Sequence, residues 1–121
     1  PTGVDEQAGL LLMNNEGQMA SVMLSLHSKQ PKRGMISCEK GYIEILEYPR
    51  AWEATITDAE TGKTEVIKAG ENADALAYEL ADMERAINGD TACMHLEYTK
   101  DVMELMTAFR KEWGLKYPEE E

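Results

Sequence analysis

The hydrophobic pattern of this chain changes its period near residue 70, from two residues to about 3.6. Before that point, apolar residues alternate with others in short runs separated by glycine-containing segments, which is typical of β-strands joined in hairpins. After it, apolar residues recur every three or four positions, which is typical of amphipathic helices. This order predicts an α+β fold: a mostly antiparallel open sheet with two C-terminal amphipathic helices packed on one face.

The first part of the chain predicts three hairpins. They pair residues 8–13 with 16–26, 35–38 with 42–48, and 52–57 with 64–68. Each connection contains a glycine, and in the second one (EKG) we expect Gly41 to adopt the positive φ that a tight turn needs.

The second part predicts two helices. The first carries an apolar stripe and ends at Asn88-Gly89, where glycine supplies the left-handed residue. The second begins at about Thr99, a plausible N-cap, and ends at Gly114. Their stripes are Leu76, Leu80, Met83 and Ile87 in the first helix, and Val102, Leu105, Met106, Phe109 and Trp113 in the second.

The alternating stretch 16–26 has two apolar faces of different character. We expect the first, formed by Ala20, Val22, Leu24 and Leu26, to be core covered by the helices. The second, formed by Met19, Ser21, Met23 and Ser25, carries no charge in a chain of net charge −11. Because the helices cover only one side, we expect a second copy of the chain to cover this face in a homodimer.

Composition limits the possible partners. The 121 residues fit one domain. With 23 acidic against 12 basic residues, the chain repels polyphosphates, and its one basic cluster (HSKQPKR) indicates a solvated loop, so no nucleic-acid partner is expected. No apolar run approaches the roughly 20 residues of a membrane-spanning helix, so no membrane partner is expected either.

The two cysteines, Cys38 and Cys93, lie in apolar surroundings without a CxxC motif. We interpret them as small buried residues in a reducing compartment, and we expect the protein to be cytoplasmic. The sequence leaves open a disulfide between them.

Motifs for catalysis or cofactor binding are missing from the sequence. No two glycines form a GxG or a P-loop, which argues against dinucleotide binding by this chain alone. The histidines and cysteines lack the spacing of a metal site, apart from the weak Cys93-Met94-His95. His27 is best interpreted as a polar residue at a strand end, and His95 as a partly buried residue or a loop hydrogen-bonding group.

Three collinear stretches resemble one family. TGVDEQAGLLLMNNEGQMASV, MISCEKGYIEIL and LEYTKDVMELMTAFRKEWGLKYPEE are similar to the C-terminal domain of the Gfo/Idh/MocA oxidoreductases, nearest to the dihydrodiol dehydrogenase-like branch. In that family an N-terminal Rossmann domain precedes an α+β domain, whose open sheet helps to form the substrate cleft and very often the subunit interface.

The resemblance implies a role for the whole chain. Residues 1–121 would be a single C-terminal domain of an NAD- or NADP-dependent oxidoreductase acting on a sugar, polyol or dihydrodiol-type small molecule. The N-terminal Rossmann domain would be absent from this chain, so no catalytic, cofactor-binding or metal residue is assigned in it. Residues 17–25 and 41–47 would belong to the open sheet, and Met19, Ser21, Met23 and Ser25 are the candidate dimer interface.

Two other functions remain possible from the sequence. A stand-alone α+β binding module would use the same uncharged face for a ligand or another protein. A small independent enzyme would use His27 or His95, but neither is accompanied by a nucleophile, a metal set or a paired carboxylate.

Overall fold

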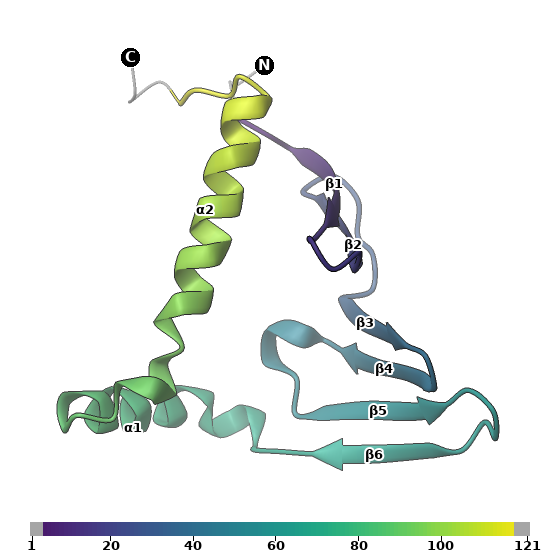
Figure 1. Cartoon of the computed structure of the whole chain (residues 1–121). Helices are drawn as coiled ribbons and strands as arrows, with labels where there is room; N and C mark the ends of the chain where they lie inside the picture. Colours follow the sequence, from purple (N-terminus) through teal and green to yellow (C-terminus); the bar gives the residue numbers. More distant parts are fainter. Residues whose placement is uncertain (1–3, 118–121) are drawn as a thin grey trace. The chain divides into compact units, whose positions relative to one another are not determined.

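The structure is a computed structural model that describes residues 4–117. Its strands are β1 (Gln7–Met13), β2 (Met19–Ser25), β3 (Arg33–Cys38), β4 (Gly41–Leu46), β5 (Glu53–Asp58) and β6 (Thr64–Lys68) (Figure 1). Its α-helices are α1 (Ala75–Ile87) and α2 (Leu96–Glu112), and short 3-10 helices are η1 (Tyr48–Arg50), η2 (Asn72–Asp74) and η3 (Thr91–Met94). The predicted α+β class, with open antiparallel strands before two helices, is confirmed.

The chain divides into two compact units. One contains the residues up to Lys29 together with those from Leu96 onward, and the other is Gln30–His95. The first unit holds the β1–β2 hairpin and α2, and the second holds the remaining elements.

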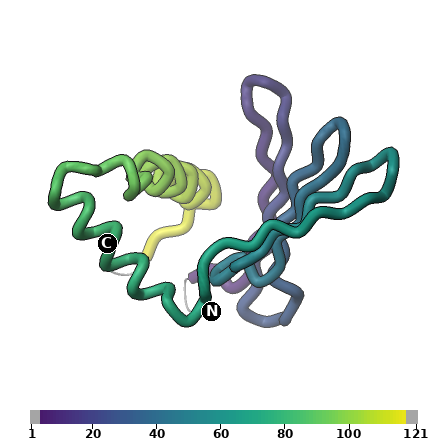
Figure 2. Tube along the Cα trace, turned by 90° about the horizontal axis from the view of Figure 1, so that it is seen from below, coloured from purple at the N-terminus to yellow at the C-terminus, as the bar shows by residue number. Residues whose placement is uncertain are grey.

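The six strands form two sheets instead of one. β1 and β2 make a two-stranded sheet, and β3, β4, β5 and β6 make a four-stranded sheet in that order. All neighbouring strands are antiparallel, so the three predicted hairpin pairings are confirmed. Figure 2 follows the backbone through the turns of the four-stranded sheet. Tyr48, which we expected at the end of a strand, lies in η1.

Side-chain hydrogen bonds shape the turn of the first hairpin. The Asn14 Oδ1 atom accepts hydrogen bonds from the backbone N–H groups of Glu16 (3.0 Å) and Gln18 (2.9 Å). Gly17 has a φ of 81°, a conformation that most residues adopt only at a cost. The NNEGQ segment therefore encodes this turn locally.

The expectation for Gly41 was wrong. Gly41 is paired in β4 opposite Asp58, and its φ is not positive. A Cβ atom at this position would collide with the backbone carbonyl oxygen of Thr57 in β5. Glycine is therefore needed because two strands approach closely, and not because of the turn.

The predicted C-terminal ends of both helices are confirmed, whereas the predicted start of the second helix is wrong. α1 ends before Gly89, which has a φ of 102°, and α2 is followed by Gly114, which has a φ of 65°. α2, however, begins at Leu96, so Thr99 lies within the helix and is not its N-cap. His95, in a left-handed conformation with a φ of 46°, immediately precedes the helix and separates it from η3.

The predicted core face of β2 was wrong in part. Val22 is half-buried, but Leu24 is 51% exposed and Leu26 is 85% exposed. None of the residues that the structure describes is fully buried. A two-stranded sheet shields its side chains only with their direct neighbours, which is why burial on this face stays partial.

Candidate interaction face and open cavity

The register of the first hairpin gathers the uncharged residues of both strands on one face. Met13 faces Met19, Leu11 faces Ser21, Gly9 faces Met23, and Gln7 faces Ser25. Directly opposed residues of antiparallel strands lie on the same side of the sheet. We call these eight residues the hairpin face. It contains the four residues singled out from the sequence and no charged side chain.

The large side chains of the hairpin face are mostly accessible. Met13 is 72% exposed, Leu11 71%, Met23 68% and Met19 65%. A Cβ atom at Gly9 would lie 3.4 Å from the Met23 sulfur, so the missing side chain of Gly9 leaves room for the Met23 thioether across the strand. The surface is therefore uncharged and carries three flexible methionines, as in adaptable protein interfaces.

Charged groups lie at the open end of the hairpin instead of on its face. The His27 Nε2 atom is 2.7 Å from a carboxylate oxygen of Glu6, and both side chains are more than half exposed. The Ser25 hydroxyl accepts hydrogen bonds from the backbone N–H groups of His27 (3.1 Å) and Ser28 (2.9 Å). His27 thus lies where the strand meets solvent, as the sequence indicated. His95 is exposed, not partly buried, and belongs to the other unit.

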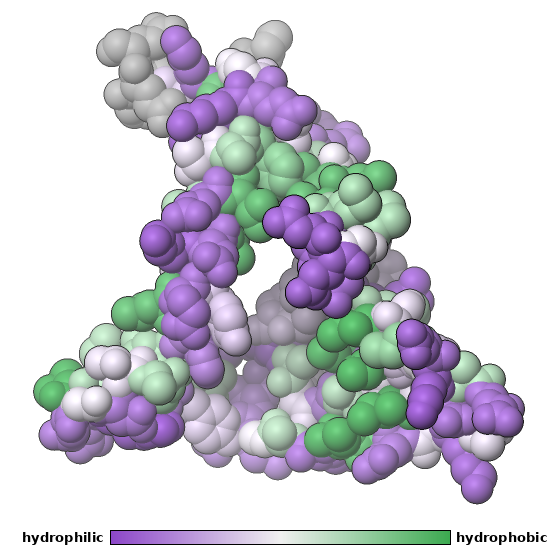
Figure 3. Space-filling view, viewed as in Figure 1, coloured by the Kyte–Doolittle hydropathy of each residue, from purple (hydrophilic) through white to green (hydrophobic). Residues whose placement is uncertain are grey.

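A second apolar face was missed in the sequence. The registers of the four-stranded sheet place five isoleucines on one side, namely Ile36, Ile43, Ile45, Ile56 and Ile67. Ile36 and Ile67 are about half exposed, and the others are half-buried. Figure 3 shows hydrophobic residues at the surface over this sheet. The opposite side carries the ion pairs Arg33–Glu44 and Glu53–Lys68, each at 3.6 Å.

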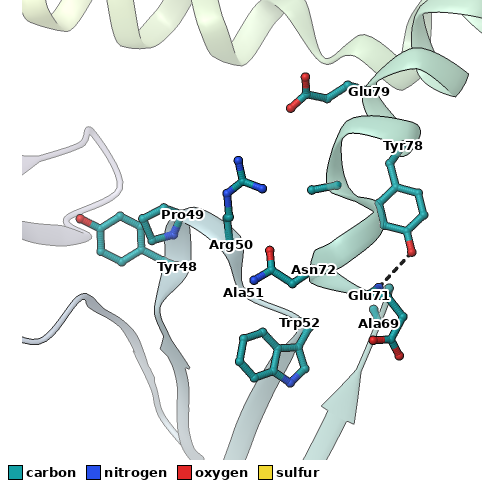
Figure 4. A pocket seen from close by; sticks show the side chains of 12 residues that line it. Tyr48, Pro49, Arg50, Ala51, Trp52, Ala69, Glu71, Asn72, Tyr78 and Glu79 are labelled. Atoms are coloured by element: carbon teal, nitrogen blue, oxygen red, sulfur yellow. Dashed lines mark hydrogen bonds between the residues drawn. The ribbon is translucent and has the colours of Figure 1, made fainter.

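An open cavity of about 600 Å³ lies within the second unit (Figure 4). It is bounded by η1, by the residues that precede β5, by the segment that follows β6, and by the first turns of α1. Its lining is Tyr48, Pro49, Arg50, Ala51, Trp52, Ala69, Gly70, Glu71, Asn72, Ala75, Tyr78 and Glu79. No sequence motif marks it, because the residues come from two separate stretches of the chain, 48–52 and 69–79.

One wall of the cavity is fixed by Tyr78 of α1. Its hydroxyl accepts a hydrogen bond of 2.9 Å from the Glu71 backbone N–H, and its ring packs against Gly70. Gly70 has a φ of 72°, and a Cβ there would lie 3.3 Å from the ring. Glycine is required at this position for conformation and for space.

The opposite wall is fixed by η1. Glu47, which precedes it, has a left-handed backbone with a φ of 49°, uncommon for a non-glycine residue. The Arg50 N–H donates to the Glu47 carbonyl at 2.9 Å, and the Ala69 N–H donates to the Trp52 carbonyl at 2.8 Å. These bonds join η1 and the ends of β5 and β6 in one framework.

The cysteines do not match the sequence interpretation in full. Both are free thiols; Cys38 is exposed, whereas Cys93 is half-buried. The Cys93 thiol donates to the Asp90 carbonyl at 3.0 Å. Beside it, Arg85 pairs with Asp90 at 2.6 Å and with Asp82 at 3.1 Å, and the Asp90 carboxylate raises the pKa of Arg85. This cluster ties the end of α1 to η3.

Within residues 4–117, no group of three His, Cys, Asp or Glu side chains is arranged to hold a metal ion. In the same part of the chain, no helix combines the length and the apolar character needed to cross a bilayer. Comparison of the sequence with protein-family models and with curated proteins, and of the structure with solved structures, found no match.

Proposed function

We propose that this chain is the C-terminal substrate-side and oligomerisation domain of an NAD- or NADP-dependent oxidoreductase acting on a sugar, a polyol or a dihydrodiol-type compound. The family resemblance of the three sequence stretches supports the oxidoreductase part of the proposal. The α+β class and the open antiparallel strands are consistent with it.

The observation that carries the association part is the hairpin face. Four large apolar side chains there are each 65–72% exposed, and no charge interrupts them. A contiguous exposed apolar surface usually marks an interface. In a twofold dimer, this face of one copy would lie against the same face of the other, which is an isologous contact.

The chain's residues do not fit the dinucleotide itself. The glycines with positive φ, at positions 17, 62, 70, 89 and 114, lie in turns, after helices or, for Gly70, between β6 and η2, and none belongs to a GxG motif. Such a motif before a helix is what brings backbone N–H groups close to a pyrophosphate. In this proposal, cofactor binding and hydride transfer belong to a Rossmann domain outside residues 1–121.

Sedimentation equilibrium of the 121-residue chain tests the association. The wild type should sediment as a dimer. Met23→Glu should shift it to a monomer, because dimerisation would bury an unpaired carboxylate at a cost of several kcal/mol.

Met103→Glu in α2 is the matched control, since it introduces the same charge at a methionine that is 55% exposed. This variant should remain dimeric. A monomeric wild type at high concentration, or a Met23→Glu variant that still dimerises, would show that the hairpin face is not the interface.

The second candidate is a stand-alone α+β binding module that uses the hairpin face for a ligand or a different protein. The flexibility of Met13, Met19 and Met23 favours it, because methionine-rich surfaces adapt to varied partners. A wild type that is monomeric at all concentrations would favour this candidate over the first.

A further inference from the structure

The cavity of the second unit contains polar groups that no other described residue engages. The Arg50 guanidinium, the Asn72 amide and the Glu79 carboxylate have no hydrogen bond or ion pair within residues 4–117. Figure 4 shows the Arg50 and Glu79 side chains projecting into the space between η1 and α1. Of the three other arginines, Arg33 and Arg85 form ion pairs with carboxylates.

Three aromatic residues line the same cavity. Tyr48 is 55% exposed, Tyr78 46% and Trp52 44%, and all three belong to the lining of the cavity. A second hollow of about 300 Å³ is lined by Lys32 and Glu47, and it shares Arg50, Trp52 and Asn72 with the first. Arg50 and Trp52 are therefore accessible from both hollows.

We propose that this cavity binds a small monocarboxylate with a planar apolar body. An unpaired guanidinium beside an amide is suited to a carboxylate, which it binds through two parallel hydrogen bonds. Trp52 supplies apolar contact area of the kind that small-molecule sites use for the rest of the ligand.

The charges around Arg50 restrict the ligand to one negative charge. Glu71 and Glu79 line the same cavity, and Glu47 lines the adjoining hollow, so three carboxylates outnumber the two cations there, Arg50 and Lys32. The chain also carries a net charge of −11. A dicarboxylate or a phosphorylated compound would place its second charge in this negative field, which disfavours its binding.

Titration of benzoate into the ¹⁵N-labelled 121-residue chain tests the proposal by NMR. Benzoate should shift the Trp52 indole signal and the backbone amides of residues 69–72 along one saturable curve. The indole of Trp113, which stacks on Phe109 at 5.9 Å and does not line the cavity, is the internal control. Benzyl alcohol, which has the same ring without the charge, and phthalate, which has a second carboxylate, should each bind at least about tenfold more weakly.

Arg50→Gln should weaken benzoate binding by about tenfold or more, and Arg50→Lys should recover only part of the loss. Arg33→Gln is the matched control, because Arg33 is an exposed arginine of the same unit that lines neither hollow. The proposal is wrong if benzoate causes no saturable shift at Trp52, if benzyl alcohol binds equally well, or if Arg50→Gln binds benzoate like the wild type. This inference involves only residues 30–95, so its failure and the failure of dimerisation are separate results.

Discussion

Gly34 and Gly41 lie on adjacent strands of one sheet, but only Gly41 must be glycine. Gly34 has open space where a Cβ would be, whereas a Cβ at Gly41 would collide with the Thr57 carbonyl oxygen of β5. Gly41→Ala should therefore lower the free energy of unfolding by about 2 kcal/mol, because β4 and β5 must separate to accept the methyl group. Urea denaturation measures this loss.

Gly34→Ala is the control for the previous change. It adds the same methyl group to the same sheet, and it should alter the free energy of unfolding by less than about 1 kcal/mol. Equal losses in the two variants would mean that the close approach at Thr57 does not determine the need for glycine.

Asp58 organises the turn between β5 and β6. Its Oδ1 atom accepts hydrogen bonds from the Thr61 backbone N–H (2.7 Å), the Thr61 hydroxyl (2.7 Å) and the Glu60 backbone N–H (3.2 Å). The pKa of Asp58 is therefore lower than its ordinary value. The main cause is the hydrogen bond from the Thr61 backbone N–H, and the second is the hydrogen bond from the Thr61 hydroxyl. The charged carboxylate is thus favoured in the folded chain.

A pH dependence follows from this direction. Because the pKa is lower in the folded than in the unfolded chain, the stabilisation is present above about pH 4 and disappears as the pH falls through the folded-state value. Asp58→Asn should therefore be less stable than the wild type at pH 7, and the difference should shrink below about pH 4. Urea denaturation at several pH values measures it, and a difference that grows in acid would contradict the assignment.

At the scale of elements, the start of α2 separates two interpretations of Thr99. An N-cap threonine would lose about 1 kcal/mol of stability on replacement by alanine. Thr99 instead lies on an exposed position inside α2, where alanine is the better helix former by about 0.5 kcal/mol. Thr99→Ala should therefore raise the free energy of unfolding slightly, as measured by urea denaturation followed by far-ultraviolet circular dichroism.

The control for Thr99 is Thr107, in the same helix. The Thr107 hydroxyl donates a 2.7 Å hydrogen bond to the Met103 carbonyl one turn earlier, so its replacement also tests the effect of removing a local bond. Neither alanine variant should show the decrease of about 1 kcal/mol in the free energy of unfolding that loss of an N-cap causes. A loss of about 1 kcal/mol for Thr99→Ala alone would instead support a helix that begins at Thr99.

At the scale of the whole molecule, the lack of any fully buried residue among those described makes association matter for stability. If a second copy covers the hairpin face, folding is linked to dimerisation, and the melting temperature should rise by several degrees over a hundredfold increase in protein concentration. Differential scanning calorimetry measures this rise. The Met23→Glu variant should show a melting temperature independent of concentration, and a wild type with the same independence would argue against linked dimerisation.

The sequence by itself determined the order of the elements and the C-terminal ends of the helices. The change of period near residue 70 predicted the strands before the helices, and Gly89 and Gly114 predicted where the helices stop, because helix termination depends on the conformation of one or two residues. The alternation in residues 19–25 likewise predicted that Met19, Ser21, Met23 and Ser25 share one face.

The tertiary structure decided which elements and side chains are neighbours. The division of the strands into two sheets, the five-isoleucine face and the need for glycine at position 41 all depend on which strands pair and in what register. The cavity around Arg50 joins two stretches of the chain, so that Tyr48 and Tyr78, 30 residues apart in the sequence, line the same space. Hydrophobic periodicity reports which side of an element is apolar. It does not identify the neighbour that covers this side, because hydrophobic burial is non-directional.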